Sequence, residues 1–239
     1  MNNQTFTDTV RTSGIPLSVK YQGRTVICLA IIAGFTDAYG FLNFKTYLSF
    51  MSGNTTQIGF SIGQENYHAV VLGLLAIFSF VTGVFTGTLF SDVRRFKKIW
   101  MPYTIVSMLL LLYMFTTLFF RNTYYSIIQL GLSMGYMNTA ISYVGKQPVN
   151  PDFVTGTLNN MARHIAFWIN KVALPDSQGA WDTHKSRALK LIIIWISFLI
   201  GAFISVVIKS MLGIYALLFP ALGLLAIAYA YTFVRHDTV

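Results

Sequence analysis

Apolar residues in this chain gather in six long stretches, which short polar intervals separate. Reading for about 20 consecutive, mainly apolar residues gives stretches at 25–44, 69–90, 100–120, 124–145, 189–209 and 212–234. Charged residues mark the intervals, above all the run at 92–98 and the longer interval at 170–190. An apolar stretch of this length can cross a bilayer as an α-helix. The pattern therefore predicts an all-α polytopic membrane protein with six transmembrane helices.

Positive charges favour one orientation of these helices. Lysine and arginine precede the first stretch and follow the second, fourth and sixth, at Arg11, Lys20, Arg24, Arg94, Arg95, Lys97, Lys98, Arg163, Lys171, Lys185, Arg187, Lys190 and Arg235. The opposite side receives mainly Arg121 and Lys209. Because cytoplasmic loops carry the excess of Lys and Arg, we expect both termini to be cytoplasmic. Residues 1–23 then form a cytoplasmic N-terminal tail, and 170–190 form a cytoplasmic loop.

The composition agrees with this class and excludes others. The chain of 239 residues is 54% hydrophobic and only 10% charged, whereas soluble domains carry about 25% charged residues. The formal net charge of +9 does not indicate nucleic-acid binding, because the basic residues flank apolar stretches as topology signals do. The polar N-terminal tail lacks the apolar core of a removable signal peptide. We therefore expect the first apolar stretch to remain as a membrane span and the lipid bilayer to be the main partner.

Two pairs of similar segments divide the chain into halves. The run Gly-Phe-Thr-Asp-Ala at 34–38 precedes Ser-Gly-Asn-Thr at 52–55, and Gly-Tyr-Met-Asn-Thr-Ala at 135–140 precedes Thr-Gly-Thr at 155–157. Residues 79–87 likewise resemble 197–205, with small residues four apart that let helices approach closely in lipid. The repeats are 24–122 and 123–239, with three spans each, and an odd number inverts the second copy. We expect two inverted three-helix repeats, with a broken or re-entrant segment after spans one and four.

Asp37 and Asn138 are the central candidate residues. Asp37 lies about 12 residues into the first span, near mid-membrane at about 1.5 Å per residue. A carboxylate at that depth is costly, so it faces a cavity or a partner, or takes up a proton. The alternative is a packing residue bonded to a neighbouring hydroxyl, such as that of Thr36 or Ser52. Asn138 would take the equivalent place in the second half, either in the same site or as a hydrogen-bonding contact between helices.

The two later polar runs read as helix starts at membrane depth. Ser, Asn and Thr are preferred at helix N-caps, and Gly permits unusual backbone angles. Such starts expose N–H groups and a positive dipole end, which favour an anion. The candidate solute-binding residues are therefore Asp37, Ser52, Gly53, Asn54, Thr55, Asn138, Thr155, Gly156 and Thr157. The alternative is that both runs are ordinarily capped surface loops.

On these residues the chain resembles the YoaK family of small bacterial inner-membrane proteins. The resemblance rests on the 34–38 run, on Ser-Phe-Met-Ser-Gly-Asn-Thr at 49–55, and on the second-half residues Asn138 and 155–157. It covers nearly the whole chain, from about Arg24 to Val234, and the family usually has Thr at the position of Ser52. Its members are often labelled small permeases. The resemblance implies a multi-pass protein of the bacterial inner membrane and leaves the substrate open.

Three function classes follow from these features. A secondary transporter or permease for a small polar, anionic solute, with protons as the coupling ion, would use the interrupted helices and Asp37. The alternative is a non-transporting membrane scaffold or sensor. We expect no enzyme, because the chain has neither a Gly-x-Ser-x-Gly elbow nor a His-Glu-x-x-His motif. No cofactor and no metal ligand set is expected, and a homodimer is a possible assembly.

Overall fold

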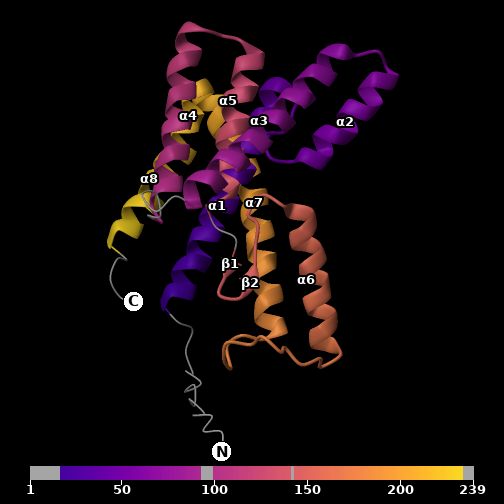
Figure 1. The fold of residues 1–239 in the computed structure, drawn as a ribbon, viewed down its shortest axis with the longest axis vertical. Helices are drawn as coiled ribbons and strands as arrows, with labels where there is room; N and C mark the ends of the chain where they lie inside the picture. Colours follow the sequence, from indigo (N-terminus) through magenta and orange to yellow (C-terminus); the bar gives the residue numbers. More distant parts are fainter. Residues whose placement is uncertain (1–16, 93–98, 141–142, 234–239) are drawn as a thin grey trace, which may run out of the picture.

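The computed structural model describes residues 17–92, 99–140 and 143–233 as a mainly helical chain. The elements are α1 (Leu17–Phe44), α2 (Met51–Gly63), α3 (Tyr67–Asp92), α4 (Met101–Phe119), α5 (Thr123–Asn138), β1 (Tyr143–Val144), β2 (Gln147–Pro148), α6 (Val154–Ile169), α7 (His184–Leu212), the 3₁₀ helix η2 (Gly213–Leu217) and α8 (Leu218–Phe233). Figure 1 shows how they are arranged. Some of the basic residues that indicated the orientation lie outside the described residues, namely Arg11, Arg94, Arg95, Lys97, Lys98 and Arg235.

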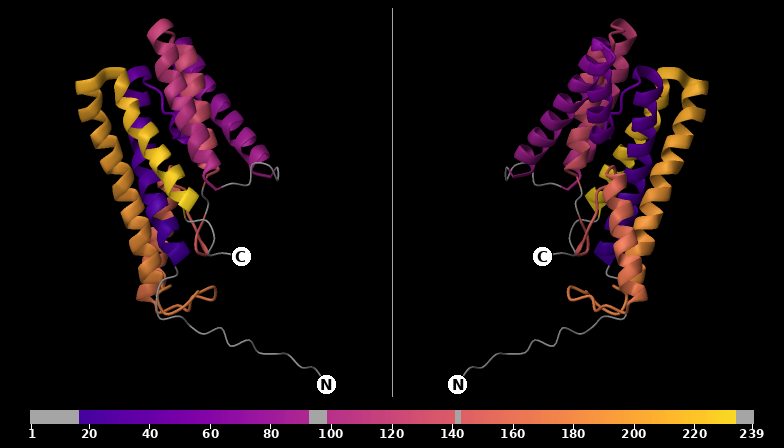
Figure 2. Two further views of the ribbon diagram at one scale, coloured as in Figure 1. Left: turned by 90° about the vertical axis from the view of Figure 1, so that its left-hand side faces the viewer. Right: turned by 90° about the vertical axis from the view of Figure 1, so that its right-hand side faces the viewer.

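The helices pack in two groups. Helix α1 packs along α7 and contacts α8, while α3 packs along α5, and α5 also packs against α4. The contact between α4 and α8 joins the groups, which Figure 2 shows side by side. The shorter helices cover one long helix each, α2 on α3 and α6 on α7. Both short helices therefore lie on the outside of the pair of groups.

Glycines permit the two closest helix contacts. A Cβ atom at Gly34 would collide with the carbonyl oxygen of Phe198, and one at Gly201 with that of Ile31. The pairing of α3 with α5 repeats this arrangement, with Gly83 and Gly135 against the carbonyl oxygens of Leu132 and Phe80. Such small residues let helix backbones touch where lipid supplies no hydrophobic driving force. The four glycines thus hold α1 against α7 and α3 against α5.

The surface of the bundle is suited to lipid. Within the described residues, four stretches are long and apolar enough to cross a membrane: Ser18–Phe44, Tyr67–Phe90, Met101–Phe119 and His184–Thr232, of which the last contains α7, η2 and α8. Large apolar side chains such as Phe78, Phe115 and Phe203 are exposed on these helices. At 16 residues α5 is shorter than these stretches, and its side chains are mostly buried. The structure thus has the membrane character that the composition predicts.

The helices at the fourth and fifth predicted spans begin and end elsewhere than predicted. The fourth was expected over 124–145, but α5 ends at Asn138 and residues 143–148 form a two-stranded antiparallel hairpin. Gly145 turns the hairpin with φ +61°, a conformation that helices do not contain. Helix α7 starts at His184, where Thr183 and Ser186 form a capping box. The interval expected over 170–190 is therefore shortened to 170–183.

Candidate functional site

Asp37 lies in α1 and is buried against the segment that connects α1 to α2. Its side chain is 4% exposed, and Oδ1 accepts hydrogen bonds from the N–H groups of Leu48 (2.7 Å) and Ser49 (2.8 Å). These amides immediately precede α2, so the carboxyl occupies the positive end of that helix. The alternative of a packing residue named the hydroxyls of Thr36 and Ser52, and neither is the partner of this carboxyl. Thr36 bonds to the carbonyl of Ile32 (2.8 Å) and Ser52 is exposed.

In the second half of the chain the acid, Asp152, lies on the segment that connects α5 to α6. Asn138, at the end of α5, donates from Nδ2 to Oδ2 of Asp152 at 3.1 Å. Asp152 is 6% exposed and lies close enough to Asp37 for the two charges to interact. The two halves therefore bring two buried carboxyl groups and one amide together between the starts of α2 and α6. We call Asp37, Asn138 and Asp152 the central cluster.

Asp152 and Ser49 were missed in the sequence, although a signal was present. Aligning residues 50–53 with 153–156 on their shared Phe and Gly places Asp152 opposite Ser49. The Ser49 side chain lies beside the Asp37 carboxyl, and its hydroxyl is buried without a hydrogen bond of regular geometry. In the first half the acid is thus on the helix and a hydroxyl on the connecting segment. In the second half the amide is on the helix and the acid on the segment.

The expected helix starts are present, but their caps differ from the prediction. Phe50 and Phe153 are the N-cap residues of α2 and α6, with φ/ψ of −83°/74° and −90°/72°, and neither helix has a side-chain cap. Each phenyl ring packs over the glycine three residues later, Gly53 or Gly156, where a Cβ atom would collide with it. These glycines therefore make room for an aromatic ring. Capping by Ser or Thr, the reason for the prediction, is wrong.

The other predicted residues separate into two sets. Asn54 and Thr157 face inward: Asn54 bonds to both the N–H (3.0 Å) and the carbonyl (2.7 Å) of Tyr47, and Thr157 bonds to the carbonyl of Phe153 (3.1 Å). Ser52, Thr55 and Thr155 are exposed on the outer faces of α2 and α6. Of the predicted residues, the structure thus brings only Asp37 and Asn138 into the central cluster.

A cavity of about 380 Å³ lies between α1, α4, α5 and the end of α7. Its lining includes Tyr39 and Tyr113, whose rings meet edge to face at 6.4 Å, and the basic residues Arg121 and Lys209. Asp37 does not line it, nor does it line the larger cavity described next. In this conformation the Asp37 carboxyl is therefore enclosed by protein.

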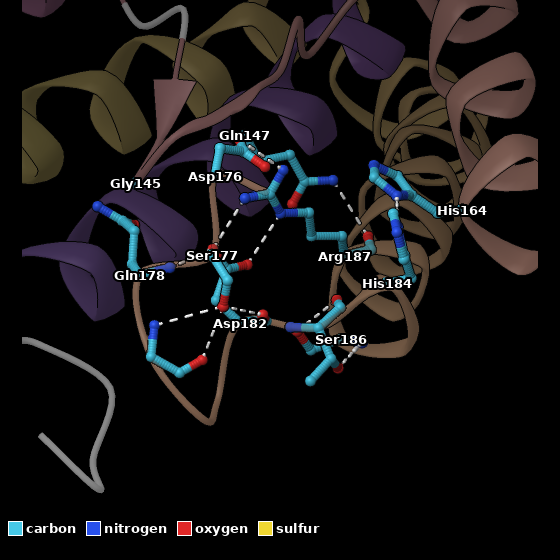
Figure 3. A network of polar contacts seen from close by, with 12 residues as sticks. Gly145, Gln147, His164, Asp176, Ser177, Gln178, Asp182, His184, Ser186 and Arg187 are labelled. Carbon is cyan, nitrogen blue, oxygen red and sulfur yellow. Dashed lines mark hydrogen bonds and ion pairs between the residues drawn. The ribbon is translucent and has the colours of Figure 1, made fainter. Parts of the chain in front are cut away.

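A second polar cluster lies at the opposite end of the bundle, where α7 starts (Figure 3). Arg187 forms a two-pronged ion pair with Asp182, at 2.9 Å from Nε and 2.8 Å from Nη2, and its Nη1 bonds to Asp176 at 3.1 Å. Burial alone would raise the pKa of Asp182, but the hydrogen bonds from Arg187 and the Gln178 N–H outweigh burial and lower it. This ion pair fixes the 176–182 segment to α7.

Two histidines connect α6 to α7 beside that ion pair. The Nδ1 atoms of His164 and His184 are 2.8 Å apart, so one ring donates and the other accepts. Burial, with the charges of His184 and Arg187, lowers the pKa of His164. A cavity of about 1010 Å³ adjoins His184. Within the described residues, no three His, Cys, Asp or Glu side chains are grouped as metal ligands.

Comparison with known proteins now adds to this geometry. The chain matches the family described as "Protein of unknown function (DUF1275)" over residues 25–230. The chain belongs to the DUF1275 family. It is 27% identical over 155 residues to the UPF0700 transmembrane protein YoaK of Bacillus subtilis (strain 168), covering 61% of this chain and 68% of that protein. It is 26% identical over 205 residues to the UPF0700 transmembrane protein RA0705 of Rhizobium meliloti (strain 1021), covering 86% and 84%. No solved structure matches the chain.

The DUF1275 match confirms the resemblance to YoaK that the sequence motifs indicated. It includes the whole central cluster and both cavities, since all of these residues fall between 25 and 230. Together with the apolar helices, the transmembrane relatives identify the chain as a membrane protein.

Proposed function

We propose that this DUF1275 protein is a proton-coupled secondary transporter for a small anionic solute, built from two inverted three-helix repeats. The observation that carries the proposal is the central cluster. Each half contributes one buried carboxyl group at the break before a short helix: Asp37 accepts from the Leu48 and Ser49 amides, and Asp152 accepts from Asn138. Interrupted helices at a repeat interface are where many secondary transporters bind substrate and coupling ion.

Equivalent contacts in the two halves support the inverted repeats. Helix α1 packs on α7 as α5 packs on α3, and α2 covers α3 as α6 covers α7. The glycine contacts correspond position by position: Gly34 matches Gly135 and Gly201 matches Gly83, each against the equivalent carbonyl oxygen. Chance similarity between apolar helices would not reproduce both pairings. The basic residues at the start of α7 give the orientation, with that end of the bundle in the cytoplasm.

The two central carboxyls provide the means of coupling. Two carboxylates that share a buried site repel each other, so the pair holds a proton at modest cost and releases it when a positive partner or water arrives. Asn138 donates to Asp152 and the segment amides donate to Asp37, so each acid has a partner when ionised. We infer that the pair exchanges one proton during each transport cycle.

Access to the cluster requires a conformational change. Asp37 is enclosed here, so we regard this conformation as occluded. The entrance that we propose is the 380 Å³ cavity, which α1 lines in part and which presents Arg121 and Lys209 to an arriving anion. Its Tyr39–Tyr113 contact is the candidate gate. Movement of the 45–50 segment, which Asp37 and Asn54 hold through its backbone, would then expose the carboxyl.

Proton flux into liposomes tests the proposal. The full chain is reconstituted around a pH-sensitive dye, and small mono- and dicarboxylates and inorganic phosphate are added outside one at a time. At least one anion is expected to acidify the lumen with saturable kinetics. Asp37→Asn and Asp152→Asn should abolish this coupled flux, whereas Asp176→Asn, an exposed acid outside the central cluster, should retain it. Wild-type flux in both central variants, or no saturable anion in the panel, would refute the proposal.

The hydrogen bonds of Asp37 also favour a second candidate, a non-transporting scaffold or sensor. Its carboxyl already holds the Leu48 and Ser49 amides, which is what a purely structural anchor for α2 requires. A scaffold predicts that Asp37→Asn keeps both the fold and the function, because the amide oxygen of Asn still accepts these bonds. A transporter predicts a stable but uncoupled protein.

A further inference from the structure

The larger cavity, of about 1010 Å³, lies at the basic end of the bundle, away from the central cluster. The end of α6, the 171–183 segment and the start of α7 surround it. Its walls include the aromatic side chains of Phe167 and Trp168, the ammonium groups of Lys146 and Lys171, and the imidazole of His184. The space is large enough for a small organic molecule, because ligand pockets usually have volumes of about 300–1,000 Å³.

His184 has an unused hydrogen-bonding atom. The residue is 8% exposed, its Nδ1 bonds to His164, and its Nε2 is buried without a partner within the described residues. Burying such an atom without a partner is unfavourable, because its hydration is lost and not replaced. The residue lines the cavity and the bond to His164 orients its ring, while Nε2 itself is covered by protein in this conformation. A ligand that accepts a hydrogen bond from Nε2 would remove this cost.

The free charge in the cavity is positive. Asp182 is the acid among its lining residues, and both of its oxygens are already engaged by Arg187, at 2.9 and 2.8 Å (Figure 3). Neither Lys146 nor Lys171 forms an ion pair with any other described residue. Two ammonium groups and one imidazole N–H supply more donors than one carboxylate uses fully, and they suit the three oxygens of a phosphate group.

We propose that this cavity binds a phosphate-bearing ligand. Lys146 and Lys171 pair its charge, and His184 donates from Nε2 in the tautomer whose Nδ1 accepts the hydrogen bond from His164. Phe167 and Trp168 form an apolar wall beside the group to which the phosphate is attached. The phosphate belongs either to a soluble phosphate ester or to the headgroup of an anionic lipid, since the cavity opens near one end of the apolar bundle. This site is separate from the central cluster, and the inference does not depend on transport.

Two binding measurements test the site with the full chain in phosphate-free detergent. Isothermal titration calorimetry measures the binding of inorganic phosphate and glycerol 3-phosphate, which represent the soluble source. Native mass spectrometry compares phosphatidic acid, whose phosphate monoester has three free oxygens, with phosphatidylcholine, whose phosphate is a diester in a headgroup without net charge. Saturable one-to-one binding in either arm supports the proposal and identifies the source. No saturable binding in either arm overturns it.

Matched variants separate this site from general attraction to a basic surface. Lys146→Gln combined with Lys171→Asn should weaken binding about tenfold or more. Asn is chosen because residue 171 has φ +52°, which Asn tolerates. His184→Phe, which keeps an aromatic ring against Phe167, should weaken binding several-fold. Lys20→Gln, an exposed lysine of α1 outside the lining, should change it by less than about twofold. Equal losses in Lys20→Gln and Lys171→Asn would overturn the proposal.

Discussion

Substitutions at Asp37 separate its structural role from a role in proton transfer. Both segment amides, from Leu48 and Ser49, donate to the same oxygen, Oδ1. Asp37→Ala leaves two buried N–H groups without an acceptor, at about 1–3 kcal/mol each, which gives a loss of about 2–6 kcal/mol. Asp37→Asn keeps one oxygen in the same place and loses only the charge assistance, a loss of about 1 kcal/mol. The amide variant is therefore expected to fold almost as stably as the wild type.

Hydrogen exchange at the two amides measures this difference directly. Each factor of ten in protection corresponds to about 1.4 kcal/mol, so the Ala variant should lose about 30-fold or more and the Asn variant about fivefold. Unfolding in mixed detergent micelles should give the same order. Thr36→Val is the matched control, because the Thr36 hydroxyl bonds only to the Ile32 carbonyl within α1. If Asn and Ala lose equal protection, the bonds to Oδ1 do not hold this segment.

Three further predictions concern other contacts. Gly201→Val should destabilise the bundle by about 1–3 kcal/mol, because the valine side chain would meet a backbone carbonyl of α1. Thermal unfolding in detergent checks this, and an unchanged midpoint would contradict the close packing. Arg187→Met should lower the free energy of unfolding by about 3 kcal/mol, because the carboxylate of Asp182 is then buried without a cation. The double variant Arg187→Met, Asp182→Leu should recover part of this stability in the same assay. The fold should lose stability as the pH falls below about 6.5, the ordinary pKa of histidine. Burial lowers the pKa of His164, so the unfolded chain takes up this proton before the folded chain does. Thermal unfolding in detergent measured against pH checks this, and an unchanged midpoint down to pH 5 would contradict it.

The sequence predicted most of the helices and two of the three residues of the central cluster, Asp37 and Asn138. Long apolar stretches located α1, α3, α4, α7 and α8 to within a few residues at most ends, because the requirement for apolar length dominates in membrane helices. The hairpin at 143–148 was missed, since Tyr143 and Val144 are apolar enough to extend the preceding stretch. Periodicity cannot distinguish a short strand from a helix end.

Asp152 is the residue of the central cluster that the sequence did not predict. It lies among polar residues, in a segment that reads as an ordinary loop, and only the fold buries it to 6% exposure beside Asn138. Ser52 and Thr155 show the reverse error, because they were assigned to the site although their side chains are exposed. Their residue types are typical of helix caps, yet Phe50 and Phe153 occupy the N-cap positions instead. Residue type indicated the helix start, but which residues face inward depends on tertiary packing.

Each half supplies one carboxyl group and one neutral polar side chain, and the two halves place them at opposite positions. The first half has its acid on the long helix at Asp37 and its smaller polar group on the segment at Ser49, whereas the second half has Asn138 on the helix and Asp152 on the segment. If both acids stood on the helices, the connecting segment of the second half would offer its amides to a carboxylate, and both short helices would be anchored in the same way. With the acids exchanged, Asp37 is held by backbone amides and Asp152 by a side-chain amide, so the two breaks are held unequally. In the proposed transport cycle, this difference would let the two breaks open one at a time.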